Sequence, residues 1–130
     1  MTDHHPHRER TWARKFGDAS RGLKLGVRGQ SSFFVHFFVA VLVVTAGLVM
    51  RIDSLAQWCL LLLCITVVLA AEMFNSAMES MARAVTLETD PHIRDALDIG
   101  SAAVLVASVG ASAVGAAIFL SRLGTMLGWW

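Results

Sequence analysis

The amino-acid sequence predicts an all-α integral membrane protein, in which an amphipathic surface helix precedes three transmembrane helices. Hydrophobic residues make up 55% of the 130 residues and charged residues only 16%, which is unusually apolar for a soluble domain. Three apolar runs are each long enough to cross a bilayer. A basic segment with helical spacing precedes them. A chain of this length is expected to hold a single domain.

The amino-terminal part divides into a polar tail and a basic amphipathic segment. Residues 1–8, MTDHHPHR, predict a disordered tail, for which solvation is a simpler interpretation than metal binding by its histidines. From about residue 9 to residue 29, apolar side chains such as Trp12, Phe16 and Leu23 recur at helical spacing, and most basic residues lie on other faces. This pattern is typical of a helix that binds an anionic membrane surface. No recognised motif supports nucleic acid as a partner.

The spans are expected at about residues 33–50, 55–84 and 95–120. The first begins FFVH, and its His36 is interpreted as an interfacial histidine. The second span continues beyond its apolar part without glycine or proline, so it should project from the bilayer. TLETDPHIRD is expected to be a polar link, with Pro91 as a break. Small residues repeat at i+4 in the third span, which favours close helix packing within lipid.

Basic residues predict the orientation of the chain. Seven of the 11 Lys and Arg residues precede residue 31, and Arg83 and Arg94 lie on the same side of the membrane. Only Arg51 and Arg122 fall on the other side. Because basic residues favour the cytoplasmic side, the amino terminus is expected there and the carboxyl terminus outside.

The second span ends in the polar sequence EMFNSAME, residues 72–79. Glu72, Asn75 and Glu79 are spaced i, i+3 and i+7, which places them on one helix face within about 60°. Asp98, near the start of the third span, should reach the same depth. Carboxylate and amide oxygens suit Mg²⁺. The simpler alternative is that these acids are merely solvated.

At these residues the sequence resembles the family of small prokaryotic diacylglycerol and undecaprenol kinases. The family's first motif matches Glu72, Asn75 and Glu79, with Ser76 and Ala77 between them. A second motif matches DIGSAAV at residues 98–104, and KFGDASRGLKLGVRGQSSFFVH is similar to the family's surface helix and the start of its first span. The resemblance covers about residues 14–120.

The resemblance implies a homotrimer with composite sites in the bacterial cytoplasmic (inner) membrane. It also implies transfer of the γ-phosphoryl group of ATP to a membrane lipid hydroxyl, on diacylglycerol or undecaprenol, with Mg²⁺. The implied roles are the base for the lipid hydroxyl at Glu72, nucleotide or phosphate binding at Asn75 and Asp98, and metal binding at Glu79, with Gln30 at the family's other metal position. Lys24 and Arg94 are further expected to bind the nucleotide, and Arg94 or Arg83 is expected to supply the charge that is missing at Leu97.

Three positions depart from the family pattern. Leu97 stands where the family usually has Lys, Gln30 where it has a metal-binding Glu, and Arg83 where it often has Asp. The departures keep open a catalytically degenerate member that acts by binding. A small transporter or channel subunit with Glu72 as its ion site is a further alternative, but acids at one interface and no inverted repeat count against it. The sequence does not name the acceptor lipid.

Overall fold

Four helices make up the described part of the chain. The computed structural model describes residues 11–28, 31–85 and 90–129. The helices are α1 (Trp12–Arg28), α2 (Ser31–Val49), α3 (Leu55–Val85) and α4 (Pro91–Met126). No strand occurs among these residues, and the all-α prediction is confirmed. The predicted tail at residues 1–8 lies outside the described residues.

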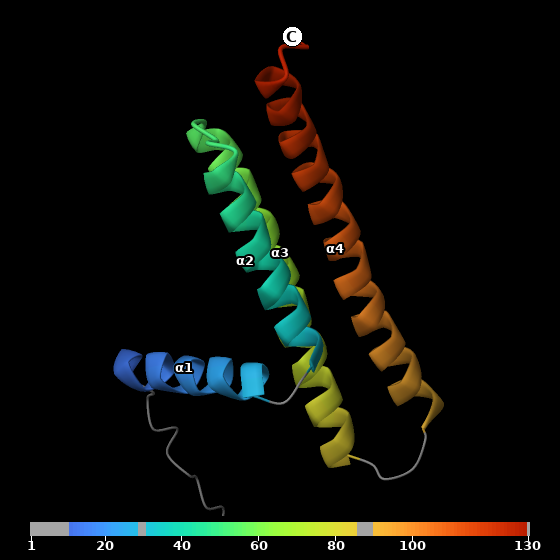
Figure 1. Ribbon diagram of the computed structural model, residues 1–130. Helices are drawn as coiled ribbons and strands as arrows, with labels where there is room; N and C mark the ends of the chain where they lie inside the picture. Colours follow the sequence, from blue (N-terminus) through green and yellow to red (C-terminus); the bar gives the residue numbers. More distant parts are fainter. Residues whose placement is uncertain (1–10, 29–30, 86–89, 130) are drawn as a thin grey trace, which may run out of the picture.

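Helix α3 is the centre of the arrangement, because it contacts each of the other three helices. Figure 1 shows α2 and α4 running lengthwise beside it, whereas α1 lies crosswise at the end where α2 begins. Gly26 of α1 faces Met73 of α3, and a Cβ at Gly26 would lie 3.7 Å from the Met73 side chain. The crosswise position of α1 is the one expected of a surface helix beside three spans.

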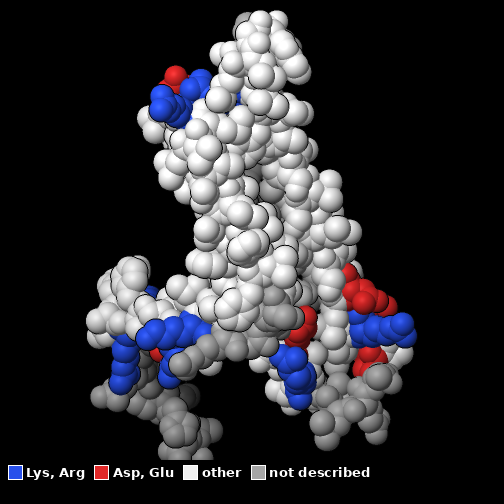
Figure 2. All heavy atoms as spheres, in the orientation of Figure 1, with Lys and Arg blue, Asp and Glu red and all other residues white. Residues whose placement is uncertain are grey.

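The three long helices bury little of their apolar surface within a single chain. In the described part of the chain, α2, α3 and α4 are long and apolar enough to cross a membrane. Few side chains form a core between them: Phe33, Ile52, Leu61, Val68, Val104 and Ile118. Figure 2 shows charged side chains gathered at the two ends of the molecule, with an uncharged band between them. A bilayer or further protein chains must therefore cover the apolar band, since water would not be tolerated there.

The tight turn between α2 and α3 is tied to α4. Arg51 has a positive φ of 52°, and the turn is closed by the amide of Ile52, which donates to the carbonyl of Gly47 at 3.0 Å. The Nε of Arg122 donates to the carbonyl of Met50 at 2.9 Å, and its Nη2 donates to the carbonyl of Arg51. Its Nη1 lies 3.7 Å from Asp53 Oδ1. One arginine of α4 thus satisfies two carbonyls of the turn.

Helix α4 begins before and ends after the span predicted at residues 95–120. Pro91 is not a break in a link but the first residue of α4, and Asp90 caps the helix. The Asp90 carboxylate accepts from the amides of His92 at 2.8 Å and Ile93 at 3.3 Å. Proline suits this position because the first helical amide has no partner within the helix. The helix then continues to Met126, so it is longer than the expected span at residues 95–120.

Candidate functional site

The predicted stripe of oxygen-bearing side chains is present on α3, and two of its three members are buried. Glu72 is 2% exposed and Asn75 is 7% exposed, whereas the side chain of Glu79 is 34% exposed. A carboxylate removed from water requires compensating polar partners. Burial therefore distinguishes Glu72 from a solvated acid at the end of a span.

Within the described ranges, two side chains of α2 lie against the Glu72 carboxylate. The hydroxyl of Ser32 donates to Glu72 Oε1. His36, one turn further along α2, places its Nε2 3.8 Å from Glu72 Oε2. Neither contact was predicted. The sequence assigned no role to Ser32, and it indicated an interfacial position for His36. The missing information was the register of α2 against α3, because these contacts join positions about 40 residues apart.

Asn75, Glu79 and Arg83 form a polar ladder that continues along α3 from Glu72. The Nδ2 of Asn75 donates to Glu79 Oε1 at 3.1 Å. Arg83 Nη1 lies 3.9 Å from Glu79 Oε2. The ladder runs from a buried amide to an exposed guanidinium whose side chain is 70% exposed. Arg83 therefore places a cation beside Glu79, at a position where the family often has an acid.

Helix α4 approaches this ladder at Gly100, the glycine of the second motif. A Cβ placed on Gly100 would lie 2.7 Å from Asn75 Oδ1. The same oxygen is buried and has no hydrogen-bond partner among the described residues. Only a residue without a side chain fits this close approach. The two motifs thus meet through Gly100 and Asn75, a contact that sequence spacing did not predict.

Three further predicted site residues are exposed in a single chain. Asp98, Arg94 and Lys24 are exposed, and no hydrogen bond or ion pair joins their side chains to Glu72 or Asn75 within the described ranges. Gln30 lies outside the described residues. Nor does the described part contain a group of three or more His, Cys, Asp or Glu that could hold a metal ion. Asp98 and Gly100 are two positions apart, so they point to nearly opposite sides of α4.

Chemically, one end of the helical bundle presents a buried carboxylate, a buried amide and a half-exposed carboxylate in order of increasing exposure. Glu79 fits Mg²⁺ by donor type, since this ion is commonly held by one or two carboxylates together with phosphate oxygens and water. The protein therefore belongs to the class of multi-pass membrane proteins, and its polar site lies at one end of the spans and becomes more exposed from Glu72 to Glu79.

Comparison with known families agrees with this class. Residues 17–119 match the family model described as prokaryotic diacylglycerol kinase, and the chain belongs to that family. The membership supports a lipid kinase in general. No curated protein and no solved structure matches the chain.

Proposed function

We propose that the protein is an integral membrane lipid kinase that transfers the γ-phosphoryl group of Mg·ATP to the hydroxyl of diacylglycerol or undecaprenol. The observation that carries the proposal is the 2% exposure of Glu72 on a helix face that leads outward to Glu79. A lipid hydroxyl stays at the membrane interface, and ATP stays in water. A site that runs from buried to exposed over about 10 Å of helix lets the two substrates meet.

In this mechanism Glu72 is the general base. As the lipid oxygen attacks the γ-phosphorus, the bond from that phosphorus to the β–γ bridging oxygen breaks and ADP leaves. The hydroxyl proton passes to the Glu72 carboxylate. A base held beside the reacting hydroxyl typically contributes about 10²–10⁴-fold to the rate.

The outer part of the stripe serves the phosphates. Glu79 would hold Mg²⁺, which neutralises the developing charge on the phosphates. The amide of Asn75 keeps Glu79 in place through the 3.1 Å hydrogen bond. Arg83 places a cation beside Glu79, so Arg83 and Arg94 are the two candidates to replace the lysine that is absent at Leu97. Phosphoryl transfer needs mainly positioning and charge neutralisation, so few side chains suffice.

The proposal includes assembly of three chains with composite sites. Asp98 and Arg94 are exposed on α4, and each could complete the site of a neighbouring chain instead of its own. The apolar surface left uncovered by a single chain supports association in the membrane. In this arrangement the amino terminus is cytoplasmic and α1, with Lys24, lies on the anionic inner surface of the bacterial cytoplasmic membrane.

The test uses the purified full chain in mixed micelles with Mg·ATP and either diacylglycerol or a polyprenol. Transfer of labelled phosphate to one of these lipids is expected, and Glu72→Gln should reduce it at least 100-fold. Asp53→Asn is the matched control, because Asp53 is 82% exposed at the opposite end of the spans. Arg94→Ala should also abolish turnover if Arg94 replaces the missing lysine.

Failure of transfer to every lipid would favour the catalytically degenerate alternative. The residues at Gln30, Leu97 and Arg83 are the specific reason to keep that alternative. It predicts nucleotide or lipid binding without turnover, which equilibrium dialysis with labelled ATP would measure on the same preparation.

A further inference from the structure

We propose that Ser32 and His36 are positioning residues for Glu72, which fix its carboxylate so that Oε2 faces the acceptor hydroxyl. The inference rests on the proposed kinase function and deepens it. Neither residue touches the phosphates; both act through Glu72.

The hydroxyl of Ser32 behaves differently from other hydroxyls on the described helices. Four of those bond back to a carbonyl of their own helix, four residues earlier: Thr45 to Val41, Thr66 to Leu62, Ser101 to Leu97 and Thr125 to Ser121. Ser32 is the second residue of α2, so no carbonyl of its own helix lies four positions before it. Its hydroxyl is therefore free to bond another helix, and it donates to Glu72 Oε1.

That hydrogen bond restricts the rotation of the buried carboxylate. A hydrogen bond to an ionised acceptor is stronger than one between neutral groups. With Oε1 held by Ser32, Oε2 is left as the oxygen that can receive a proton. Holding a catalytic group in one orientation can alter a rate by a large factor, since misplacement by about 1 Å can cost 100-fold.

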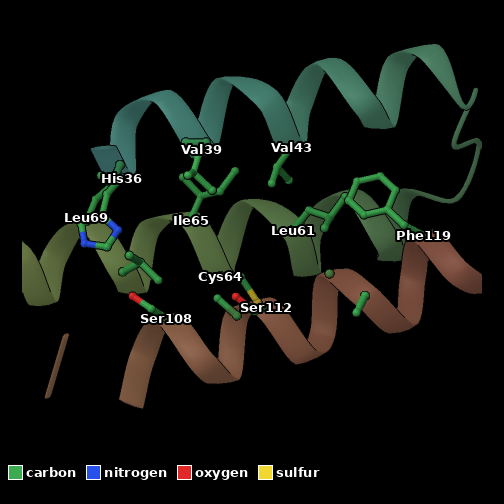
Figure 3. Close-up of a pocket in the computed structure, with 15 residues that line it drawn as sticks. His36, Val39, Val43, Leu61, Cys64, Ile65, Leu69, Ser108, Ser112 and Phe119 are labelled. Atoms are coloured by element: carbon green, nitrogen blue, oxygen red, sulfur yellow. The ribbon is translucent and has the colours of Figure 1, made fainter. Parts of the chain in front are cut away.

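His36 occupies the space beside Oε2. At 3.8 Å its Nε2 is too distant for a hydrogen bond, so Oε2 keeps its capacity to accept the lipid proton. The imidazole also lines an apolar pocket of about 310 Å³ between α2, α3 and α4. Figure 3 shows His36 at one end of this pocket, beside Leu69, and Phe119 at the other end. His36 therefore lies both beside Glu72 Oε2 and at the edge of the pocket.

After transfer, the protonated carboxyl needs a partner in a site shielded from water. A ring nitrogen of neutral His36 can accept that hydrogen bond once the two side chains move together by under 1 Å. The imidazole therefore stabilises the protonated form of Glu72, which is the form that the reaction produces. Ser32 acts before the proton moves, and His36 acts after it.

The experiment measures kcat and KM for both substrates in four variants. Ser32→Ala should lower kcat about 10-fold and leave KM for Mg·ATP unchanged, whereas Ser32→Thr, which keeps the hydroxyl, should restore most of it. His36→Leu should lower kcat similarly, and His36→Gln, which keeps a polar group near the position of Nε2, should retain more. Thr66→Val is the matched control, since the Thr66 hydroxyl bonds its own helix at 2.8 Å among the described residues and lies outside both motifs.

The outcomes separate the inference from the function on which it rests. An inactive parent chain refutes the kinase and the inference together. An active parent whose Ser32→Ala variant keeps its kcat refutes the role of Ser32 alone, as does a Ser32→Thr variant as slow as Ser32→Ala. A His36→Gln variant no better than His36→Leu refutes the role of His36. Equal unfolding midpoints of the variants show that a loss of kcat is not a loss of fold.

Discussion

Replacing Gly100 by alanine tests the contact through which α4 meets the polar ladder. The new Cβ would lie 2.7 Å from Asn75 Oδ1, with Met78 Sδ at 3.4 Å and Met78 Cε at 3.5 Å. Methionine can move aside because its side chain is flexible. Asn75 cannot move without stretching its 3.1 Å hydrogen bond to Glu79. Gly100→Ala should therefore disturb Asn75 and Glu79 together.

Two opposing effects determine how much Gly100→Ala changes the free energy of unfolding. Alanine favours a helix over glycine by about 1 kcal/mol, whereas overpacking a tight contact costs about 1–3 kcal/mol. Gly110 and Gly115 provide matched controls on the same helix, because an added Cβ there meets nothing within 4 Å among the described residues. In these two controls, only the higher helix propensity of alanine changes the stability. Gly100→Ala should thus be about 1–3 kcal/mol less stable than Gly110→Ala.

The assay is unfolding in mixed micelles followed by circular dichroism, with lipid phosphorylation measured on the same samples. Gly100→Ala should lower both the unfolding midpoint and kcat relative to Gly110→Ala. A Gly100→Ala variant as stable and as active as Gly110→Ala would show that α4 does not press on Asn75, and would refute the placement of the second motif against the first.

Three further predictions concern the parts of the fold that hold the spans in place. Arg122→Lys should lose the pair of hydrogen bonds that the guanidinium donates to the α2–α3 turn, and should destabilise the protein by about 1–3 kcal/mol in the same unfolding assay. An unchanged unfolding midpoint would show that these hydrogen bonds do not stabilise the turn. Gly47→Ala should displace the Trp58 indole, since its Cβ would lie 2.8 Å from Trp58 Cη2; the tryptophan emission should shift, and the shift should vanish in a Trp58→Phe background. Asp90→Ala should remove the cap of α4 at a cost of about 1 kcal/mol, visible as faster amide exchange at the first turn, and equal exchange in Asp90→Asn and Asp90→Ala would contradict this.

The sequence predicted those features that depend on one helix at a time. Apolar runs predicted the three spans, and spacing alone placed Glu72, Asn75 and Glu79 on one face of α3. Features that depend on the register between two helices were missed. The contact of Ser32 with Glu72 and the approach of Gly100 to Asn75 join separate helices, and no periodicity along one helix encodes them.

The start of α4 shows a second kind of error. Pro91 was predicted to interrupt a polar link, but proline also suits the first turn of a helix. The preceding Asp90, which accepts two amide hydrogen bonds, decides between these two roles. Asp before Pro followed by an apolar segment favours a capped helix, and that local pattern was available in the sequence.

The length of α3 and α4 has an electrostatic consequence for the proposed kinase. With 31 and 36 residues, the two helices are about 46 and 54 Å long, beyond the roughly 30 Å of a hydrocarbon core. Glu79 thereby stands about 10 Å further along α3 than Glu72. An anionic bilayer repels a polyanionic nucleotide, but that repulsion decays over about 8 Å at physiological ionic strength. In the proposed kinase, the extra helical turns would carry the level assigned to the phosphates out to where the membrane's own charge opposes ATP much less.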